Sequence, residues 1–343
     1  MAEYPGSEHE PRFAYRALVD AVTAIFMGCG MAAADARLLA DSLAQADLRG
    51  IHSHGVMRVP DYVDKLTVGG VDPRGRPSVV RERLGAVVVD AGNAMGQIAA
   101  AFAMGLAVER ARKTGIAMVA VGGSNHCGAM DYWVRLAVEA GMIGIAATNA
   151  LPTMAPWGGT SKIVGLNPVG IGIPAGDLPP FVLDVALGAT AHGKMRIYKQ
   201  KGQPIPEGWA QDGEGRPTTD PAVGLAGAML PAGGQKGANI ALLVEILAVA
   251  LPAATLSPLA GAISTNEGGP PELGQFLLAL DPAAFGGAET LARIAALAES
   301  YGEAGLRLPG ARRAAARRKA AAEGVELDEA TVATLHRLVG EPT

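Results

Sequence analysis

The order of apolar and helix-forming segments over residues 84–186 constrains the fold of this chain more than any other feature. Short apolar runs bounded by turn residues predict strands, and longer stretches with helical periodicity predict helices. The expected strands are LGAVVVD (84–90), IAMVAVGG (116–123), MIGIAAT (142–148), VGIGIP (169–174) and FVLDVA (181–186), and the expected helices are 96–115 and 127–141. No convincing helix separates the last two strands, whereas a regular doubly wound sheet needs a crossover there. The sequence therefore predicts an α/β (α+β) fold with a mixed β-sheet.

The two ends of the chain are predicted to be helical. Helices are expected at 11–28 and 32–48, and VMRVPDYVDKL resembles a third, short one. A linker rich in Gly and Pro at 69–78 marks a domain boundary near residue 78. After the central region we predict a turn-rich excursion, a buried apolar helix, another strand and a helical C-terminal part, at 195–235, 236–251, 276–281 and 287–343 in that order.

Charge, hydropathy and cysteine usage exclude several classes of function. The formal net charge of −4 argues against a nucleic-acid partner, because such proteins normally carry a basic patch. The start, MAEYPGSEHEPRF, has no basic segment followed by an apolar core, and no apolar run reaches the roughly 18 residues of a membrane span. The two cysteines, Cys29 and Cys127, lie too far apart in the sequence to suggest a disulfide framework. We therefore expect a soluble, cytoplasmic protein with no membrane partner.

The segment RGIHSHGVMRVP (49–60) holds two of the six histidines of the chain, His52 and His54, beside Ser53. Three interpretations compete: a metal site, an acid–base site and a polar turn between helices. A helical zinc pair would be spaced His-x-x-x-His, and the sequence has no cysteine pair at metal spacing, so we expect no metal. General acid catalysis by His54 would need a partner that fixes its tautomer. Composition alone is also compatible with a polar turn.

Three other residues stand where site residues are often found. Asp184 lies in the otherwise apolar run PPFVLDVAL, where a carboxylate is costly unless it is paired or caps the strand end. His126 lies between a predicted strand and a predicted helix, which is a common place for site residues. The alternative is that it is an ordinary residue at the N-terminus of the helix. Lys236 begins a helix after small residues, which suits a phosphate. The glycines of VGIGIPAG (169–176) miss the Rossmann spacing, and the prolines that follow exclude a helix start there.

Several motifs, in order and over nearly the whole chain, resemble one family. They are SHGVMRVPDYV (53–63), SNHCGAMDYW (124–133), MAPWGG (154–159), LNPVGIGIP (166–174), LDVALGATAHGK (183–194), IPEGWAQDGEGRPTTDP (205–221), KGANIALLVEIL (236–247) and LPG (308–310). The chain resembles the malate/L-lactate dehydrogenase family, which does not use a Rossmann fold and includes ureidoglycolate, sulfolactate and diketogulonate oxidoreductases and a cyclic-imine reductase. The resemblance implies NAD(P)-dependent interconversion of a 2-oxo acid and a 2-hydroxy acid, with cyclic-imine reduction as the alternative.

The same resemblance implies roles for five residues. Ser53 and His54 match the serine–histidine pair of the family, with the histidine as proton donor, and Asp184 is expected to complete a relay with them. Arg58 matches an arginine suited to a substrate carboxylate, because a guanidinium binds a carboxylate bidentately. His126 matches a histidine that some members use as the proton acceptor. It is therefore predicted as a substrate contact and as a rival of His54, and we favour His54 as the acid.

The cofactor, NAD or NADP, is expected from the resemblance to contact four short segments. The predicted contacts are Ala150, Leu183, Asp184, Val185, Ala186, Leu187, Gly188, Gln235, Lys236, Gly310, Ala311 and Arg312. The chain departs from the family pattern at Leu187 and Gly188, which replace hydroxyl residues, so that any contact there must use the backbone. Gln235 replaces an aromatic residue. Ala311 and Arg312 stand where an acidic residue is usual, and an arginine there would favour the 2′-phosphate of NADP.

The resemblance also implies the domain organisation and the assembly. Residues 1–78 and 288–343 are expected to form one helical domain, residues 79–287 an NAD(P)-binding mixed-sheet domain, and two chains a homodimer. The lost hydroxyl groups leave a diverged, non-catalytic ligand-binding member as a further alternative. The intact catalytic set favours an enzyme instead.

Overall fold

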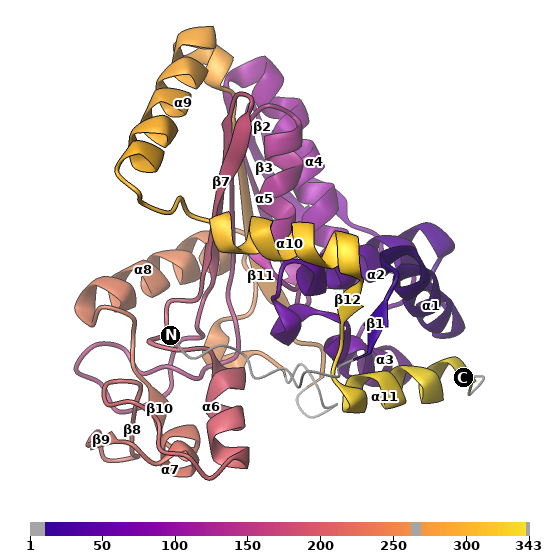
Figure 1. The fold of residues 1–343 in the computed structure, drawn as a ribbon, viewed down its shortest axis with the longest axis vertical. Coiled ribbons are helices and arrows are strands. Elements are labelled where there is room, and N and C mark those ends of the chain that lie inside the picture. Colours follow the sequence, from indigo (N-terminus) through magenta and orange to yellow (C-terminus); the bar gives the residue numbers. More distant parts are fainter. Residues whose placement is uncertain (1–10, 262–268, 341–343) are drawn as a thin grey trace.

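Seven strands form the central sheet of the computed structural model, which describes residues 11–261 and 269–340 (Figure 1). The strands are β2 (Ser78–Arg83), β3 (Ala86–Asp90), β4 (Ile116–Ser124), β5 (Ile143–Thr148), β6 (Val169–Ala175), β7 (Leu178–Val185) and β11 (Leu273–Leu280). Their order is β2-β3-β4-β11-β5-β6-β7, with β3 and β4 parallel and the other neighbours antiparallel. The predicted α/β fold with a mixed sheet is confirmed.

Strand β2 is not predicted from the sequence. Each of its residues is exposed, so the strand carries no apolar alternation that would reveal it. It forms one edge of the sheet by pairing with β3, and it begins where the expected linker at 69–78 ends. At the other edge, β7 begins three residues earlier than the expected strand and includes two prolines, which an edge position tolerates.

Helices α4 (Gly96–Thr114) and α5 (Met130–Glu139) cover one face of the sheet (Figure 1). The strand glycines allow α5 to approach closely. A Cβ atom added to Gly170 would lie 2.7 Å from the Cβ of Met130, and one added to Gly172 would lie 2.9 Å from the carbonyl oxygen of Val134. The G-x-G spacing in β6 therefore serves helix packing, which agrees with the rejection of a Rossmann fingerprint there.

Helix α8 (Gln235–Glu245) covers the opposite face and continues as a π-helix over Ile246–Ala250. Successive side chains of β11 point to opposite faces of the sheet. Leu277 packs with α4 and α5 on one face, and Phe276 packs with α8 on the other. The single buried helix expected at 236–251 is therefore wrong in two respects. The helix changes to a π-turn after Glu245, and its outer side is open, with Leu243 51% exposed.

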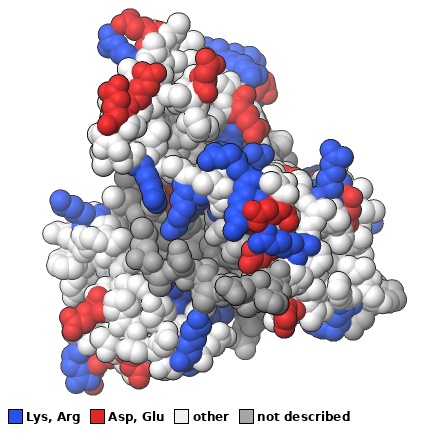
Figure 2. All heavy atoms as spheres, viewed as in Figure 1, with Lys and Arg blue, Asp and Glu red and all other residues white. Residues whose placement is uncertain are grey.

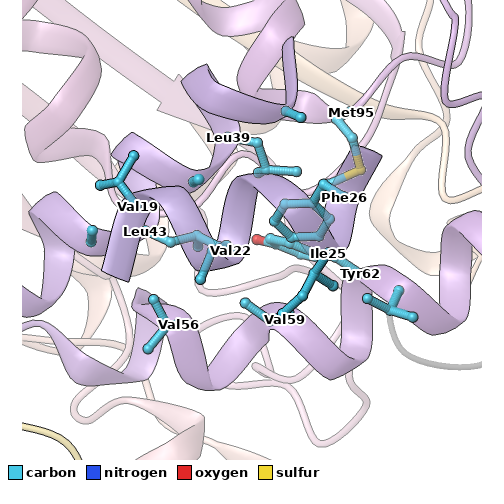
Figure 3. Close-up of a cluster of buried hydrophobic side chains, with 14 of the residues drawn as sticks. Val19, Val22, Ile25, Phe26, Leu39, Leu43, Val56, Val59, Tyr62 and Met95 are labelled. Carbon is cyan, nitrogen blue, oxygen red and sulfur yellow. The ribbon is translucent and has the colours of Figure 1, made fainter. Parts of the chain in front are cut away.

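The first three helices, α1 (Tyr15–Gly28), α2 (Ala33–Leu48) and α3 (Val59–Thr67), pack with the C-terminal end of the chain. Phe26, Leu39 and Tyr62 meet in the core of this helical part (Figure 3). Val325 and Leu335 from the C-terminal end complete the same core. The C-terminal elements are α10 (Ala311–Glu323), β12 (Val325–Glu326), which pairs with β1 (Arg12–Phe13), and α11 (Glu329–Gly340). The first ten and last three residues of the expected helical domain lie outside the described residues.

The turn-rich excursion forms a small unit with its own core of Met195, Ile205, Ala210 and Met229. Its elements are α6 (His192–Gln200), β8 (Ala210–Gln211), β9 (Pro217–Thr218), α7 (Pro221–Ala226) and β10 (Ala228–Met229). The remaining elements are the 3₁₀ turns His52–His54, Val56–Arg58, Ser257–Leu259 and Pro282–Ala284, and α9 (Gly287–Glu303), which packs against β6. Within the described ranges, no helix is long and apolar enough to cross a membrane.

Candidate active site

A short loop between α2 and α3 carries Ser53, His54 and Arg58. It consists of two 3₁₀ turns, His52–His54 and Val56–Arg58. Helix α2 can end immediately before it because Gly50 adopts a φ of +69°, a conformation that glycine takes without a Cβ clash. The segment is therefore a turn between two helices, as one of the interpretations of the sequence had it, and it also carries the candidate acid–base residues. It presents its side chains in two tight, consecutive turns.

The buried carboxylate of Asp47 holds this loop on both sides of Ser53 and His54. One oxygen accepts the Val56 amide at 2.7 Å, and the other lies 2.9 Å from Nδ1 of His52. Burial raises the pKa of Asp47, whereas His52 and the Val56 amide oppose this shift. The sequence assigned no role to Asp47, and none to His52 once a metal site was rejected. Its contact with Asp47 instead makes the His52 ring part of the support of the loop.

The His54 ring lies deep in the protein, although part of its surface stays open. Its Nδ1 atom is 2.9 Å from the Ser53 hydroxyl, so the predicted serine–histidine pair is in contact. Burial, and then the neighbouring cations Arg58 and Arg313, lower the pKa of His54 to about 4. The ring is consequently neutral at neutral pH and can accept a proton.

His126 lies beside His54, on the loop that follows β4. The two rings stack with centroids 5.7 Å apart and planes 21° apart. On its other side, Nδ1 of His126 is 2.6 Å from the hydroxyl of Tyr62, which also receives a hydrogen bond from Nε2 of Gln97 at 3.1 Å. Burial is the largest cause of a His126 pKa well below its ordinary value, and His54 and Arg58 add to it. The two histidines that compete for the acid–base role are therefore neighbours.

Arg58 faces the same space as the histidines. Its Nε donates to the Ser53 carbonyl oxygen at 2.8 Å, and its Nη1 donates to Asp61 at 3.0 Å, which fixes the guanidinium. Its positive charge lowers the pKa of His54, His126 and His192. His192 begins α6 and lies near enough to Arg58 for this charge to act on it. Sequence reasoning did not single out His192, although it lies in the quoted motif LDVALGATAHGK.

Asp184 lies at the end of β7, and its ionic partner is Arg313 of α10. Nη1 of Arg313 is 3.3 Å from the Asp184 carboxylate, and Nη2 donates to the Asp184 carbonyl oxygen at 3.0 Å. The amide of Asp131 donates to the same carboxylate at 3.2 Å. Burial raises the pKa of Asp184, and Arg313 opposes the shift. Among the described residues no hydrogen bond joins Asp184 to Ser53 or His54, so the relay through these three stays a prediction.

The predicted cofactor residues gather along the β7 edge of the sheet. The Val182 amide donates to the Pro309 carbonyl oxygen at 3.2 Å, which places the LPG segment beside β7. Beyond the strand, the Ala232 amide donates to the Leu187 carbonyl oxygen at 2.8 Å, and Gly188 bridges Pro231. Backbone pairing thus brings three segments to one edge. The Gln235–Lys236 segment is brought there by the pairing of residues 231 and 232 just before it. The residues of the three segments are Leu183, Asp184, Val185, Ala186, Leu187 and Gly188, then Gln235 and Lys236, and then Gly310, Ala311 and Arg312.

Ala150 is tied to the same region through Asn167. The Ala150 amide donates to the side-chain oxygen of Asn167 at 3.1 Å, and the neighbouring Leu166 carbonyl oxygen accepts the Leu187 amide at 2.7 Å. Asn167 is fully buried and adopts a φ of +35°, so this corner is held in a specific backbone conformation.

The β7 edge fits an anionic dinucleotide. Helices α8 and α10 both begin there, after Gly234 and Gly310, without a side-chain cap or an acidic residue in the first turn. The Ala311 amide donates to the Leu308 carbonyl oxygen at 3.1 Å, and the amides that follow the first residue of each helix can face negatively charged groups. Lys236 and Arg312 add positive charge, and Figure 2 shows Lys and Arg side chains gathered over α10. The described residues contain no group of three or more His, Cys, Asp or Glu side chains that could hold a metal ion.

Comparison with known proteins places this architecture in a family. The family model described as malate/L-lactate dehydrogenase matches residues 13–336. The chain is 40% identical over 302 residues to a (2R)-3-sulfolactate dehydrogenase (NADP(+)) of Chromohalobacter salexigens, covering 87% of this chain and 89% of the relative. It is 36% identical over 338 residues to a Δ1-pyrroline-2-carboxylate/Δ1-piperideine-2-carboxylate reductase of Pseudomonas putida, covering 98% and 99% of the two chains.

A solved structure agrees with the sequence relatives. The sulfolactate dehydrogenase of Methanocaldococcus jannaschii superimposes with a TM-score of 0.91 at 32% identity, covering 97% of each chain. The resemblance drawn from the motifs is confirmed over the described fold and over nearly the full length of the sequence. The chain therefore belongs to the malate/L-lactate dehydrogenase family of oxidoreductases.

Proposed function

We propose that this protein is an NAD(P)-dependent oxidoreductase that interconverts a 2-oxo acid and the matching 2-hydroxy acid. The observation that carries the proposal is the convergence of His54, His126 and Arg58, with Arg313 linking His54 to Asp184 at the end of β7. A cation that binds a carboxylate and a histidine that exchanges a proton are the two groups this reaction needs from the protein. Two relatives named as sulfolactate dehydrogenases support this substrate class.

Arg58 would hold the substrate carboxylate and so fix which face of C2 is presented to the cofactor. Its guanidinium is already oriented by Ser53 and Asp61, so little freedom is lost on binding. When bound, the nicotinamide cofactor supplies or accepts the hydride at C2. The carboxylate of the substrate also offsets the repulsion that Arg58 exerts on a protonated His54.

His54 would exchange the proton at the oxygen on C2. In the oxidation direction, its neutral ring takes the hydroxyl proton on Nε2 while Nδ1–H donates to Ser53. In the reduction direction the imidazolium returns that proton to the carbonyl oxygen as negative charge develops there. Asp184 and Arg313 would set the electrostatic surroundings of this exchange. Arg313 contacts the Asp184 carboxylate and lowers the pKa of His54.

The cofactor would lie along the β7 edge. Gln235 and Lys236 at the start of α8, and Gly310, Ala311 and Arg312 at the start of α10, would bind its phosphates, while the backbone of Leu183–Gly188 and of Ala150 would line the remainder. Arg312 is exposed at the end of this edge, which favours the 2′-phosphate of NADP over the free hydroxyl of NAD.

The decisive experiment is a substrate screen that follows nicotinamide absorbance. NADH and NADPH are each crossed with pyruvate, oxaloacetate, sulfopyruvate, phenylpyruvate and cyclic imines. Turnover of a 2-oxo acid is expected. Turnover of imines alone would instead assign reductase activity toward cyclic imines, a second function favoured by the relative that matches 98% of this chain. Cofactor binding without turnover of any compound would indicate a non-catalytic member.

We extend the proposal to organisation, assembly and location. The helical part formed by both chain ends would be one domain, with boundaries near 78 and 288. An exposed apolar row on α8 and the π-turn would form the contact between two chains of a homodimer; its residues are Ile240, Leu242, Leu243 and Ile246. The free cysteines Cys29 and Cys127 are compatible with the reducing conditions of the cytoplasm. Sedimentation of a Leu243→Asp variant, compared with wild type, tests the assembly.

A further inference from the structure

Two buried polar groups, Gln97 and Tyr62, lead from α4 to His126. Nε2 of Gln97 donates to the hydroxyl oxygen of Tyr62 at 3.1 Å, and that hydroxyl lies 2.6 Å from Nδ1 of His126. Gln97 is fully buried and Tyr62 is 2% exposed, so water does not reach this side of the histidine freely. Neither Tyr62 nor Gln97 belongs to the set of residues predicted from the sequence.

The tautomer of His126 follows from the direction of donation along this chain, which in the structure runs from Gln97 to Tyr62. Burial raises the pKa of Tyr62, so its phenol keeps its single proton. The phenol oxygen already accepts the Gln97 amide, and the contact at 2.6 Å gives its own proton an acceptor in Nδ1 of His126. With Nε2 of Gln97 as the donor, the Tyr62 hydroxyl would have no acceptor other than Nδ1 of His126, and a buried hydroxyl without an acceptor is unfavourable. Nδ1 of His126 is then unprotonated, and the ring proton of the neutral imidazole is on Nε2. The opposite orientation of the amide would direct the Tyr62 proton to Oε1 of Gln97, which has no hydrogen-bond partner here, so the tautomer of His126 depends on the orientation of Gln97.

His54 is not constrained in this way. Its Nδ1 atom faces the Ser53 hydroxyl, which can either donate or accept a hydrogen bond. His54 can therefore gain or lose a proton while keeping its partner. His126 would have to break its contact with Tyr62 to take a proton on Nδ1, and Nε2 already carries one. With the ring centroids 5.7 Å apart, a second imidazolium beside the first would also be repelled.

We propose that Tyr62 and Gln97 are positioning residues that hold His126 as the Nε2–H tautomer, so that His126 donates a hydrogen bond to the substrate and proton transfer is left to His54. This assignment rests on the proposed function. During oxidation of the hydroxy acid, the hydroxyl proton passes to Nε2 of His54 and the hydride leaves C2 for the nicotinamide. His126 keeps its own proton throughout and stabilises the oxygen or carboxylate that faces it.

The tautomer is measured directly in the cofactor-free protein. Long-range proton–nitrogen correlation spectra of isotope-labelled histidines, with a His126→Gln sample to assign the signals, are expected to show His126 protonated on Nε2 alone at neutral pH. Tyr62→Phe is expected to release this tautomer, whereas Tyr132→Phe, which removes a phenol bonded to Asp41, should leave the His126 signals unchanged. A proton on Nδ1, as a reversed Gln97 amide would give, overturns the assignment, and so does an imidazolium. The wild-type spectrum decides this even if Tyr62→Phe does not fold.

Kinetics of paired variants separate a hydrogen-bond donor from an acid–base group. A glutamine side chain can donate a hydrogen bond but cannot carry the transferred proton. His126→Gln is therefore expected to retain at least about tenfold more kcat than His126→Leu, a difference of about 1.4 kcal/mol in the barrier. His54→Gln and His54→Leu should be equally inactive. If His126→Gln is as inactive as His126→Leu, the donor role is wrong. If wild type turns over no 2-oxo acid, the proposed function fails while the spectra still decide the tautomer.

Discussion

The carboxylate of Asp184 lies 3.3 Å from the guanidinium of Arg313, and the same arginine lowers the pKa of His54. One side chain of α10 therefore links the carboxylate at the end of β7 to the histidine of the loop after α2. These elements are far apart in the sequence, and the helical part of the protein supplies both the arginine and the histidine. The charge state of the site thus depends on how this part packs against the sheet.

Arg313→Leu is expected to destabilise the protein by about 3 kcal/mol at neutral pH, because it leaves a buried carboxylate without its ionic partner. Burial already raises the pKa of Asp184, and the loss of Arg313 raises it further. The folded variant then binds a proton more tightly than the unfolded chain, so its stability falls as the pH rises from the unfolded pKa of Asp through the folded one. Urea denaturation at acid and neutral pH measures this. Arg318→Leu, an exposed change on the same helix, is the control. An equal loss at both pH values would contradict the prediction.

Arg313 also shows which parts of the site were predictable. The motif LPG and the arginines after it pointed to the start of α10, but the sequence analysis chose Arg312. Arg312 is exposed, whereas Arg313 contacts Asp184. Which of two adjacent side chains turns inward depends on the angle at which α10 meets β7, and that angle is set by contacts such as Val182 with Pro309. No pattern in the local sequence predicts that angle.

The histidines illustrate the same limit. His54, His126 and Arg58 were identified from motifs, and the structure brings them together. The residues that hold them were missed, because Asp47 and Tyr62 look like ordinary members of amphipathic helices and Gln97 like a helix-terminal residue. Their function arises only from long-range contacts. The mixed sheet, in contrast, was predictable because apolar alternation is local, and β2 was missed where that alternation is lacking.

Gly55→Ala is expected to destabilise the protein by about 2 kcal/mol or more and to reduce activity. A Cβ atom at position 55 would lie 2.0 Å from Oδ1 of Asp47, so the carboxylate must move and release the Val56 amide or His52. The matched control is Gly105→Ala in the middle of α4, where a Cβ meets no atom within 4 Å. That change should stabilise the helix by about 0.5–1 kcal/mol. Thermal unfolding of both variants measures the difference, and similar shifts in Tm would show that the contacts of Asp47 with Val56 and His52 do not hold this loop.

His54→Ala is expected to lower kcat by about 10²–10⁴-fold, the usual contribution of a general acid or base. Cofactor affinity should change little, because the predicted cofactor residues lie along β7, α8 and α10 instead. His336→Ala, an exposed histidine on α11, serves as the control. Steady-state rates and fluorescence titration with the reduced cofactor measure the two effects. Near wild-type kcat for His54→Ala, together with an inactive His126→Ala, would transfer the acid–base role to His126.

The stability of the wild-type protein is expected to fall as the pH drops from about 6.5 toward 4. The pKa of His54 is lowered to about 4 in the folded protein. Between these pH values His54 is therefore protonated in the unfolded chain and neutral in the folded protein. The contribution of His54 is fully present above the unfolded pKa and is lost as the pH approaches the folded one. A shift from 6.5 to about 4 bounds it at about 3.5 kcal/mol, since one pKa unit corresponds to about 1.4 kcal/mol, and the part of the ring surface that is open to solvent lowers this bound. Unfolding curves of wild type and His54→Gln should therefore converge or cross on acidification, and a constant gap between them would argue against the shift.

The start of α10 is expected to determine cofactor preference. Arg312 is exposed at the β7 edge in a helix start that lacks acidic residues, so the 2′-phosphate of NADP would gain a guanidinium and the positive end of the helix. We expect a higher kcat/KM with NADPH than with NADH. Arg312→Glu, which introduces the acidic character usual in the family, should lower kcat/KM for NADPH by about tenfold or more, because charge-assisted hydrogen bonds contribute about 1.5–3 kcal/mol. The kcat/KM for NADH should change less, because NADH has a neutral 2′-hydroxyl that the new carboxylate does not repel. Arg318→Glu makes the same charge change further along the helix, and equal effects of the two variants on NADPH would show that only the general field of α10 is involved.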